Sequence, residues 1–115
     1  MLARNFRLTA EKDYARIFSK GRPFHGRGMG MKAVRNQLDT PRIGFVVSTK
    51  VSKKAVVRNQ VKRRMREIVR KQLQTMIGGV DIVFMARPDS TKMTYADLER
   101  AMTDIMSKAG LYKKP

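Results

Sequence analysis

The chain of 115 residues contains no cysteine and no tryptophan, one histidine and only nine acidic residues. Without cysteine it can form no disulfide, thiolate zinc site or cysteine nucleophile, a composition that suits a reducing cytoplasm. No apolar run approaches the ~18 residues that a membrane span requires, and the first residues lack the apolar segment of a secretion signal. We therefore expect a cytoplasmic protein with no membrane partner.

The side chains that hydrolytic enzymes use are also scarce. The single histidine, His25, lies in a segment rich in Gly and Arg with no carboxylate near it in sequence, so we interpret it as an exposed residue and not as a catalytic base. The acids are scattered singly, and no P-loop, H-E-x-x-H, G-x-S-x-G or paired-carboxylate motif occurs. We predict no catalytic residue and no metal ligand in this polypeptide.

Positive charge is the feature that the chain has in excess. Lys and Arg number 26 against nine acids, which gives a formal net charge of +17 and a pI near 11.2. A charge of this size points to nucleic acid or an anionic surface as the partner. With 13.2 kDa and 42% hydrophobic residues, the chain is expected to form one RNA-binding domain over residues 1–115, with flexible ends at 1–6 and 112–115.

The charge is concentrated in residues 50–71, which hold ten Lys or Arg and a single acid, Glu67. Apolar residues recur there at helical spacing and gather on one side of the predicted helix: Val57, Val61, Met65, Ile68 and Val69. Polar residues lie almost opposite: Asn59, Arg63, Arg66 and Arg70. Ordinary solvated helix faces mix both signs of charge, and helices that lie on lipid usually carry Trp or Phe, so a polyanion-binding helix is the favoured interpretation.

The segment before the basic helix is predicted to hold one helix and two strands. The helix begins at Thr9 as N-cap and ends before Gly21, which supplies a left-handed exit. Residues 22–30 are expected to form a loop that runs into a strand over 27–34. A turn then leads to a strand over 42–48, and the two strands are expected to form an antiparallel hairpin.

The basic helix is expected to run from Ser52, its N-cap, to about Met76. A buried central strand over 80–86 follows, apolar on both faces apart from one aspartate. Thr94 and Asp97 resemble a capping box at the start of a last helix, whose apolar residues are Leu98, Ala101, Met102, Ile105 and Met106. The predicted order is therefore α-β-β-α-β-α, an α+β domain with one sheet of three or four strands packed by helices on one side.

Two groups of side chains suit RNA. The forked guanidinium groups of Arg63, Arg66 and Arg70 can meet successive phosphates, and Asn59 can hydrogen-bond a base edge or a ribose hydroxyl. Most hydrogen bonds between proteins and nucleic acids go to the nucleic-acid backbone. This stripe of Asn59, Arg63, Arg66 and Arg70 therefore indicates a polyanion without indicating which one. Tyr14 and Phe18 in the first helix are either core anchors or stacking platforms for unpaired bases.

Residues 55–67 carry the pattern A-V-x-R-N-x-x-K-R-x-x-R-E, preceded by V-S-T-K at 47–50. Together with the flanking D-Y-A-R-I-F-S-K-G at 13–21, A-R-P at 86–88 and Y-A-D-L at 95–98, this pattern resembles the protein subunit of bacterial ribonuclease P over nearly the whole chain. Two departures are visible: Gln60 replaces a basic residue common in relatives, and residues 29–32 replace an often aromatic strand.

The resemblance implies a small α/β sandwich in which the long basic helix forms a left-handed crossover. It implies an endoribonuclease holoenzyme in which a catalytic RNA removes the 5′ leader of precursor tRNA, with magnesium held mainly by the RNA and no obligate protein partner. The residues implied to face the catalytic RNA are Arg58, Asn59, Lys62, Arg63 and Arg66, to which the stripe adds Arg70. Tyr14, Phe18 and Lys32 are expected to bind the leader. The alternative is a structural RNA binder such as a ribosomal protein.

Overall fold

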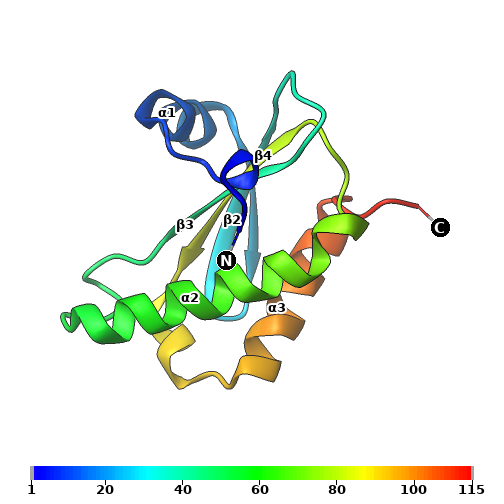
Figure 1. Ribbon diagram of the computed structural model, residues 1–115. Helices are drawn as coiled ribbons and strands as arrows, with labels where there is room; N and C mark the ends of the chain where they lie inside the picture. The colour runs from blue at the N-terminus through cyan, green and yellow to red at the C-terminus, as the bar shows by residue number, and fades with distance from the viewer. Residues whose placement is uncertain (1, 115) are drawn as a thin grey trace.

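The computed structural model describes residues 2–114, so expectations for Met1 and Pro115 lie outside the described residues. Three α-helices and four strands follow one another with short 3-10 helices between them (Figure 1). In chain order they are η1 (Arg4–Phe6), α1 (Glu11–Lys20), β1 (Arg22–Gly26), β2 (Met29–Arg35), β3 (Arg42–Val46), α2 (Ala55–Gln72), η2 (Leu73–Thr75), β4 (Val80–Ala86), η3 (Pro88–Lys92) and α3 (Tyr95–Lys108). The predicted α+β class and the order α-β-β-α-β-α are confirmed, with β1 as an additional strand.

The four strands form one mixed sheet in the order β1-β2-β4-β3. β4 pairs antiparallel with β2 and parallel with β3, so it is the central strand that its apolar sequence predicts. The predicted hairpin between the second and third strands is wrong, because β4 inserts between them. The chain leaves β3, passes through α2 and returns as β4 beside its own starting strand, which makes α2 a crossover connection.

The segment interpreted as a loop contains the edge strand β1. It pairs antiparallel with β2 through a tight turn at Arg27 and Gly28, where Gly28 has a φ of +73°. Only Phe24 of β1 packs against the main core, while Arg22 and Pro23 are exposed. An edge strand with one apolar contact lacks the alternating pattern that marks a strand in sequence, which is why the prediction missed it.

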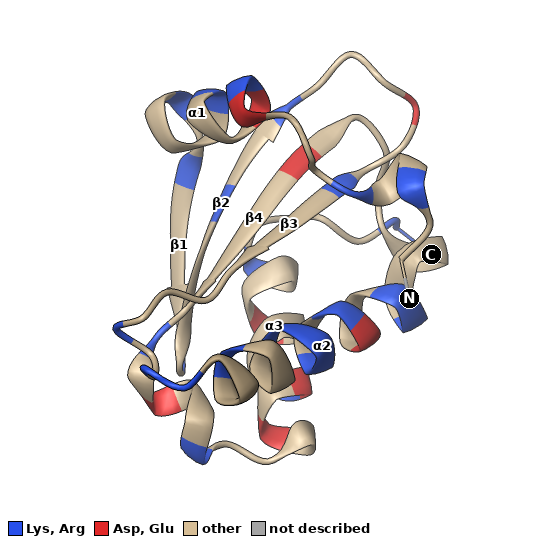
Figure 2. Cartoon of the chain, turned by 60° about the vertical axis from the view of Figure 1, so that its left-hand side comes forward, with Lys and Arg blue, Asp and Glu red and all other residues tan. Residues whose placement is uncertain are grey.

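Helices cover both faces of the sheet, and the expectation that all of them lie on one side is wrong. α2 and α3 pack on one face and build the main core with residues such as Met31, Phe45 and Phe84. α1 lies on the opposite face, where Ile17 packs with Leu8 and Val83 in a second, smaller cluster (Figure 2). Because α1 covers only one end of this face, the rest of that face stays open.

Four predicted helix ends differ from the structure. The predicted end of the basic helix is about Met76, but α2 ends at Gln72 and the 3-10 helix η2 follows to Thr75. The N-cap of α1 is Ala10 and not Thr9, and Gly21 has an extended backbone with a φ of −70° while its N–H donates to the Ile17 carbonyl. The N-cap of α2 is Lys54, because the Ser52 hydroxyl accepts from the Lys54 N–H in the turn ahead of the helix. Small polar residues close turns as readily as they cap helices.

The last helix matches its prediction. Thr94 Oγ1 accepts from the Asp97 N–H at 3.1 Å, and Asp97 Oδ2 accepts from the Thr94 N–H at 3.4 Å, which completes a capping box. All five predicted apolar positions are buried: Leu98, Ala101, Met102, Ile105 and Met106.

Parts of the predicted flexible ends pack against the domain. Leu2 is buried, and the Lys113 N–H donates to the Thr75 carbonyl at 2.7 Å after a β-bridge between Met76 and Tyr112. The contacts of Tyr112 and Lys113 place the C-terminal tail beside the segment that follows α2. The mobility of 1–6 and 112–115 stays a prediction.

Candidate nucleic-acid interface

α2 separates its apolar and basic residues as predicted. Val61, Met65, Ile68 and Val69 are buried against the sheet and α3, and Val57 is half-buried. Asn59 and Arg63 are exposed on the outer surface. Lys and Arg follow the helix along its length, with Glu67 the one acid on it (Figure 2). The amphipathic pattern therefore mounts α2 on the domain and leaves its charged side accessible.

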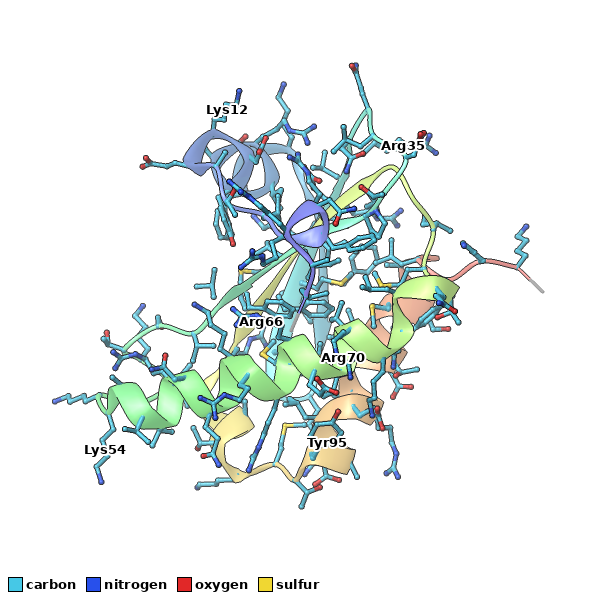
Figure 3. The ribbon with its side chains drawn as sticks, in the orientation of Figure 1. Lys12, Arg35, Lys54, Arg66, Arg70 and Tyr95 are labelled. Atoms are coloured by element: carbon cyan, nitrogen blue, oxygen red, sulfur yellow. The ribbon has the colours of Figure 1, made fainter. Side chains whose placement is uncertain are left out.

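Two of the predicted RNA-binding residues turn from α2 toward β3 and α1. Lys62 and Arg66 line a pocket of about 210 Å³ together with Arg7 and Tyr14. The Arg66 guanidinium lies 6.0 Å from the centre of the Phe45 ring, and its Nε is buried without a hydrogen-bond partner among residues 2–114 (Figure 3). A buried donor without an acceptor, surrounded by further cations, suits an anionic oxygen such as that of a phosphate.

Tyr14 forms the wall of this pocket on the α1 side. Its hydroxyl donates to the Leu8 carbonyl at 3.2 Å, and its ring lies against Gly44 of β3, where a Cβ atom would clash with the hydroxyl. Burial raises the pKa of Tyr14 above its ordinary value, although the charge of Arg66 acts in the opposite direction. Tyr14 is therefore a neutral hydroxyl beside cations at neutral pH.

Phe18 and Lys32, both expected to bind the leader, come together in the structure. Lys32 Nζ donates to the Phe18 carbonyl at 2.9 Å and lies 5.9 Å from the centre of the Phe18 ring. The Phe18 side chain is exposed, at 41% of its maximum, although it lies in an amphipathic helix. The structure thus pairs Phe18 with Lys32 at the α1 end of the open sheet face and places Tyr14 with Lys62 and Arg66.

The remaining two predicted cations are engaged within the protein. Arg58 donates from Nη1 to the Ser52 carbonyl at 2.9 Å and so holds the loop before α2. Arg70 donates to both oxygens of Glu67, at 2.6 and 3.0 Å, and these bonds lower the pKa of Glu67. Both guanidinium groups keep further donors for an external acceptor.

The sequence analysis missed the role of Asp81. This carboxylate is fully buried in β4 and accepts from Arg16 and Arg42 at 2.7 Å, from Arg42 Nε at 2.9 Å and from Asn36 at 2.7 Å. Burial by itself would raise the pKa of Asp81, but the hydrogen bonds from Arg42 and Asn36, with the Arg42 charge and the Arg16 bond, outweigh it and lower the pKa. The only signal in the sequence was a lone acid in an apolar strand.

This network determines where α1 lies. Arg16 belongs to α1, Arg42 to β3 and Asn36 to the loop between β2 and β3, so one carboxylate ties three segments to the central strand. Arg42 also pairs with Asp13 of α1 at 3.3 Å. Asp81 therefore acts on the candidate interface indirectly, through the position of Tyr14 and Phe18.

Within residues 2–114, no three His, Cys, Asp or Glu side chains come together as metal ligands. His25 is exposed, and its Nδ1 lies 2.7 Å from the Arg87 guanidinium. No helix in the described part of the chain is both long and apolar enough to cross a bilayer.

Known proteins are similar to this chain over nearly its full length. A family model described as "Ribonuclease P" matches residues 2–110. The "Ribonuclease P protein component" of Syntrophomonas wolfei is 35% identical over 114 residues, which cover 99% of this chain and 95% of the relative. The protein of the same description from Streptococcus pneumoniae serotype 4 is 33% identical over 98% of this chain and 91% of its own length.

Solved structures show the same fold. The RNase P protein of Staphylococcus aureus superposes with a TM-score of 0.86 at 27% identity, covering 94% of this chain and 98% of the other. The RNase P protein of Thermotoga maritima gives a TM-score of 0.81 at 26% identity, over 89% and 96% of the two chains. Sequence and fold thus agree over almost the whole length, and the chain belongs to the ribonuclease P protein family.

Proposed function

We propose that this chain is the protein component of a ribonuclease P holoenzyme and binds the RNA subunit of that enzyme through the charged side of α2. The observation that carries the proposal is the pocket lined by Arg7, Lys62 and Arg66, where the buried Nε of Arg66 has no hydrogen-bond partner among residues 2–114. Arg63 and Asn59 extend this surface on the outside of the helix. The holoenzyme is an endoribonuclease that acts in tRNA processing.

The reaction is assigned to the RNA subunit, and magnesium to sites held mainly by that RNA. Two features of the polypeptide support this division. Its single histidine is exposed and contacts an arginine. The carboxylate of Asp81, the most deeply buried acid, already accepts hydrogen bonds on both oxygens from guanidinium and amide groups. The part of the protein is to neutralise phosphates and to orient RNA, which cationic side chains do without any chemical step.

The substrate is precursor tRNA, and the 5′ leader is assigned to the open sheet face beside α1. The exposed ring of Phe18 can stack on an unpaired base, while Lys32, held above that ring, can meet the neighbouring phosphate. Tyr14 lies nearer to Arg66, and it is proposed to contact the leader where that strand passes the RNA subunit.

The protein is proposed to act in the cytoplasm with one RNA and no obligate protein partner. A structural RNA binder such as a ribosomal protein would also be basic, but nothing in the family comparison favours it.

The test is reconstitution. We expect the purified protein to retain one long structured RNA from cells, and the protein with the matching ribonuclease P RNA and magnesium to remove the 5′ leader of precursor tRNA at a single site. Protein alone with magnesium should leave the precursor intact. Copurification of ribosomal RNA only would contradict the proposal, and so would cleavage by the protein without RNA.

A further inference from the structure

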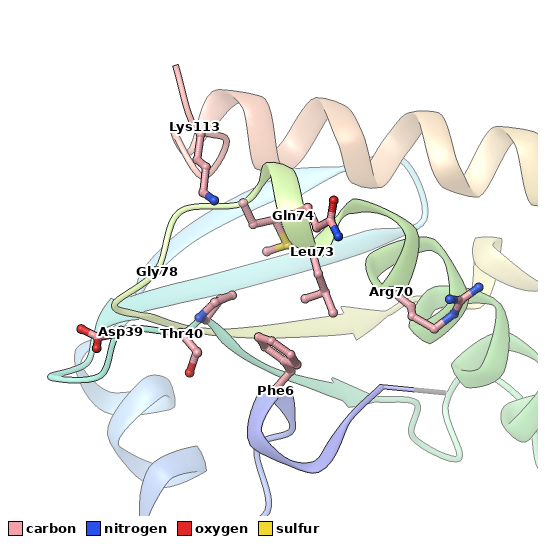
Figure 4. A pocket seen from close by; sticks show the side chains of 10 residues that line it. Phe6, Asp39, Thr40, Arg70, Leu73, Gln74, Gly78 and Lys113 are labelled. Carbon is pink, nitrogen blue, oxygen red and sulfur yellow. The ribbon is translucent and has the colours of Figure 1, made fainter. Parts of the chain in front are cut away.

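A second cavity lies at the C-terminal end of α2, and its lining shares no residue with the pocket at Arg66. Its volume is about 430 Å³, and it forms where the N-terminal segment, the loop between β2 and β3, η2 and the C-terminal tail meet. Figure 4 shows the Phe6 ring pointing into this space and facing Leu73, with Arg70 on one side and Lys113 on the other. Of the residues that line this cavity, only Arg70 belongs to a site described above.

The walls of the cavity combine an aromatic and apolar surface with two cations. Phe6 and Leu73 are half-buried and pack against the main core, so the floor is part of the folded domain. Gln74 and Thr40 add polar groups at the edge. A ring that can stack, flanked by cations and by hydrogen-bonding side chains, is the set of groups that recognises a nucleotide.

Contacts within the protein orient the side chain of Arg70 and anchor the backbone of Lys113 at the cavity. Arg70 is oriented by its two hydrogen bonds to Glu67, at 2.6 and 3.0 Å. Lys113 is placed by the 2.7 Å bond from its own N–H to the Thr75 carbonyl, after Tyr112 has paired with Met76. A guanidinium group that is already oriented, as in Arg70, loses less conformational entropy when an anion binds.

We propose that this cavity binds a single unpaired nucleotide of RNA, with its base stacked on Phe6 and its phosphate between Arg70 and Lys113. The proposal rests on the proposed function, because it takes the RNA subunit of ribonuclease P as the source of the nucleotide. Continuity supports that source: Arg70 belongs to the charged side of α2 and also lines the cavity, so an RNA strand along α2 reaches the cavity at its end.

The charge of the chain favours a nucleotide of a polyanion over a neutral metabolite. With a net charge of +17, the surface attracts RNA at long range, and the cavity offers no carboxylate other than Asp39 at its rim. The cavity volume falls within the usual range of ligand pockets, roughly 300–1,000 Å³.

The main test measures the affinity of the full-length protein for ribonuclease P RNA in the absence of substrate. Phe6→Leu keeps an apolar floor but removes the stacking ring, and it should weaken binding at least about fivefold, the lower end of what one stacked base contributes. Lys113→Glu should weaken binding clearly more than Lys12→Glu, which makes the same change of net charge at an exposed position on α1. Unchanged affinity of Phe6→Leu, or equal effects of the two charge reversals, would overturn the proposal.

A second measurement locates the nucleotide. Because the chain has no native cysteine, Lys114→Cys can carry a single iron-EDTA group beside the cavity. Cleavage of the RNA subunit should concentrate around one unpaired nucleotide and should weaken there when Phe6→Leu is added. Cleavage confined to paired regions would overturn the proposal.

The outcomes separate this proposal from the proposed function. If Phe6→Leu lowers affinity only when precursor tRNA is present, the nucleotide belongs to the substrate and the assignment to the RNA subunit is wrong. If circular dichroism shows that Phe6→Leu does not fold, the comparison of Lys113→Glu with Lys12→Glu tests the proposal in its place. Equal effects of these two variants on affinity would then overturn it. Failure of the unchanged protein to bind ribonuclease P RNA would contradict the proposed function itself. Normal binding by all variants would contradict only the proposed nucleotide site.

Discussion

Replacing Asp81 by Asn tests whether one buried carboxylate holds α1 on the sheet. Asp81 accepts four hydrogen bonds, three of them from the guanidinium groups of Arg16 and Arg42. An Asn side chain has nearly the same shape, but it carries no charge and presents an N–H₂ group toward these donors. The variant therefore leaves Arg16 without its carboxylate partner and Arg42 with Asp13 alone, at 3.3 Å.

The expected loss of stability follows from the exposure of the partners. Breaking a buried ion pair by removing one member costs about 3–5 kcal/mol. The side chains of Arg16 and Arg42 are 35% and 22% exposed to solvent, so water can hydrate them in part when the carboxylate is lost. We expect the free energy of unfolding to fall by about 2–4 kcal/mol, which lowers the melting temperature of a domain of this size by roughly 8–16 °C.

The assay is thermal and urea unfolding followed by circular dichroism, with Asp104→Asn as a control that removes an exposed acid of α3. The control should change stability by less than about 0.5 kcal/mol. A loss below about 1 kcal/mol for Asp81→Asn would refute the reasoning, because it would mean that water replaces the carboxylate without cost.

The free energy of unfolding should depend on pH differently in the unchanged protein and in Asp81→Asn. The pKa of Asp81 is lower in the folded state than in the unfolded state, so its contribution is present above the unfolded value of about 4 and is lost as the pH falls through the folded value. The unchanged protein should therefore lose more stability than Asp81→Asn when the pH falls below about 4. A stability gap between the two proteins that stays constant down to pH 2 would contradict this assignment.

Three further predictions concern the interface. Arg66→Ala should lower the slope of log affinity against log salt by about one, and an unchanged slope would show that Arg66 meets no phosphate. Phe18→Ala should weaken the binding of precursor tRNA to the holoenzyme and not that of mature tRNA, with little loss of stability because the ring is exposed; equal weakening of both would show that the ring does not contact the leader. Gly44→Ala should displace Tyr14, since the new Cβ would clash with its hydroxyl, and unfolding measurements should show a loss of about 1–3 kcal/mol; unchanged stability would refute that clash.

Local patterns in the sequence predicted the elements that carry their own signal. α3 has a capping pair and an apolar residue at each turn, and both features appear where they were predicted. β4 is apolar on both faces apart from Asp81, a pattern typical of a central strand, and the structure places it there. In each case the information lies within a few residues, because capping and helical or strand periodicity are short-range effects.

The predictions failed where long-range contacts decide between local alternatives. Ser52 and Thr9 can cap a helix or close a turn, and their sequence neighbours do not distinguish the two. β2 and β3 look like a hairpin in sequence, but β4 begins 34 residues after β3 ends and pairs with both strands, and its residues Val80 to Phe84 are buried there. The exposure of Phe18 likewise depends on how much of the sheet α1 covers.

The sequence by itself determined the net charge of this chain and the basic pattern at 55–67 that marks its family, because neither depends on how the chain folds. Only the tertiary structure decided which cations converge. Arg7 and Arg66 are 59 positions apart in the chain and line one pocket, Phe6 and Lys113 meet at another, and Asp81 draws three segments together. These sites exist because the sheet brings distant strands within hydrogen-bonding reach, and a buried charge can be stable only where such partners surround it.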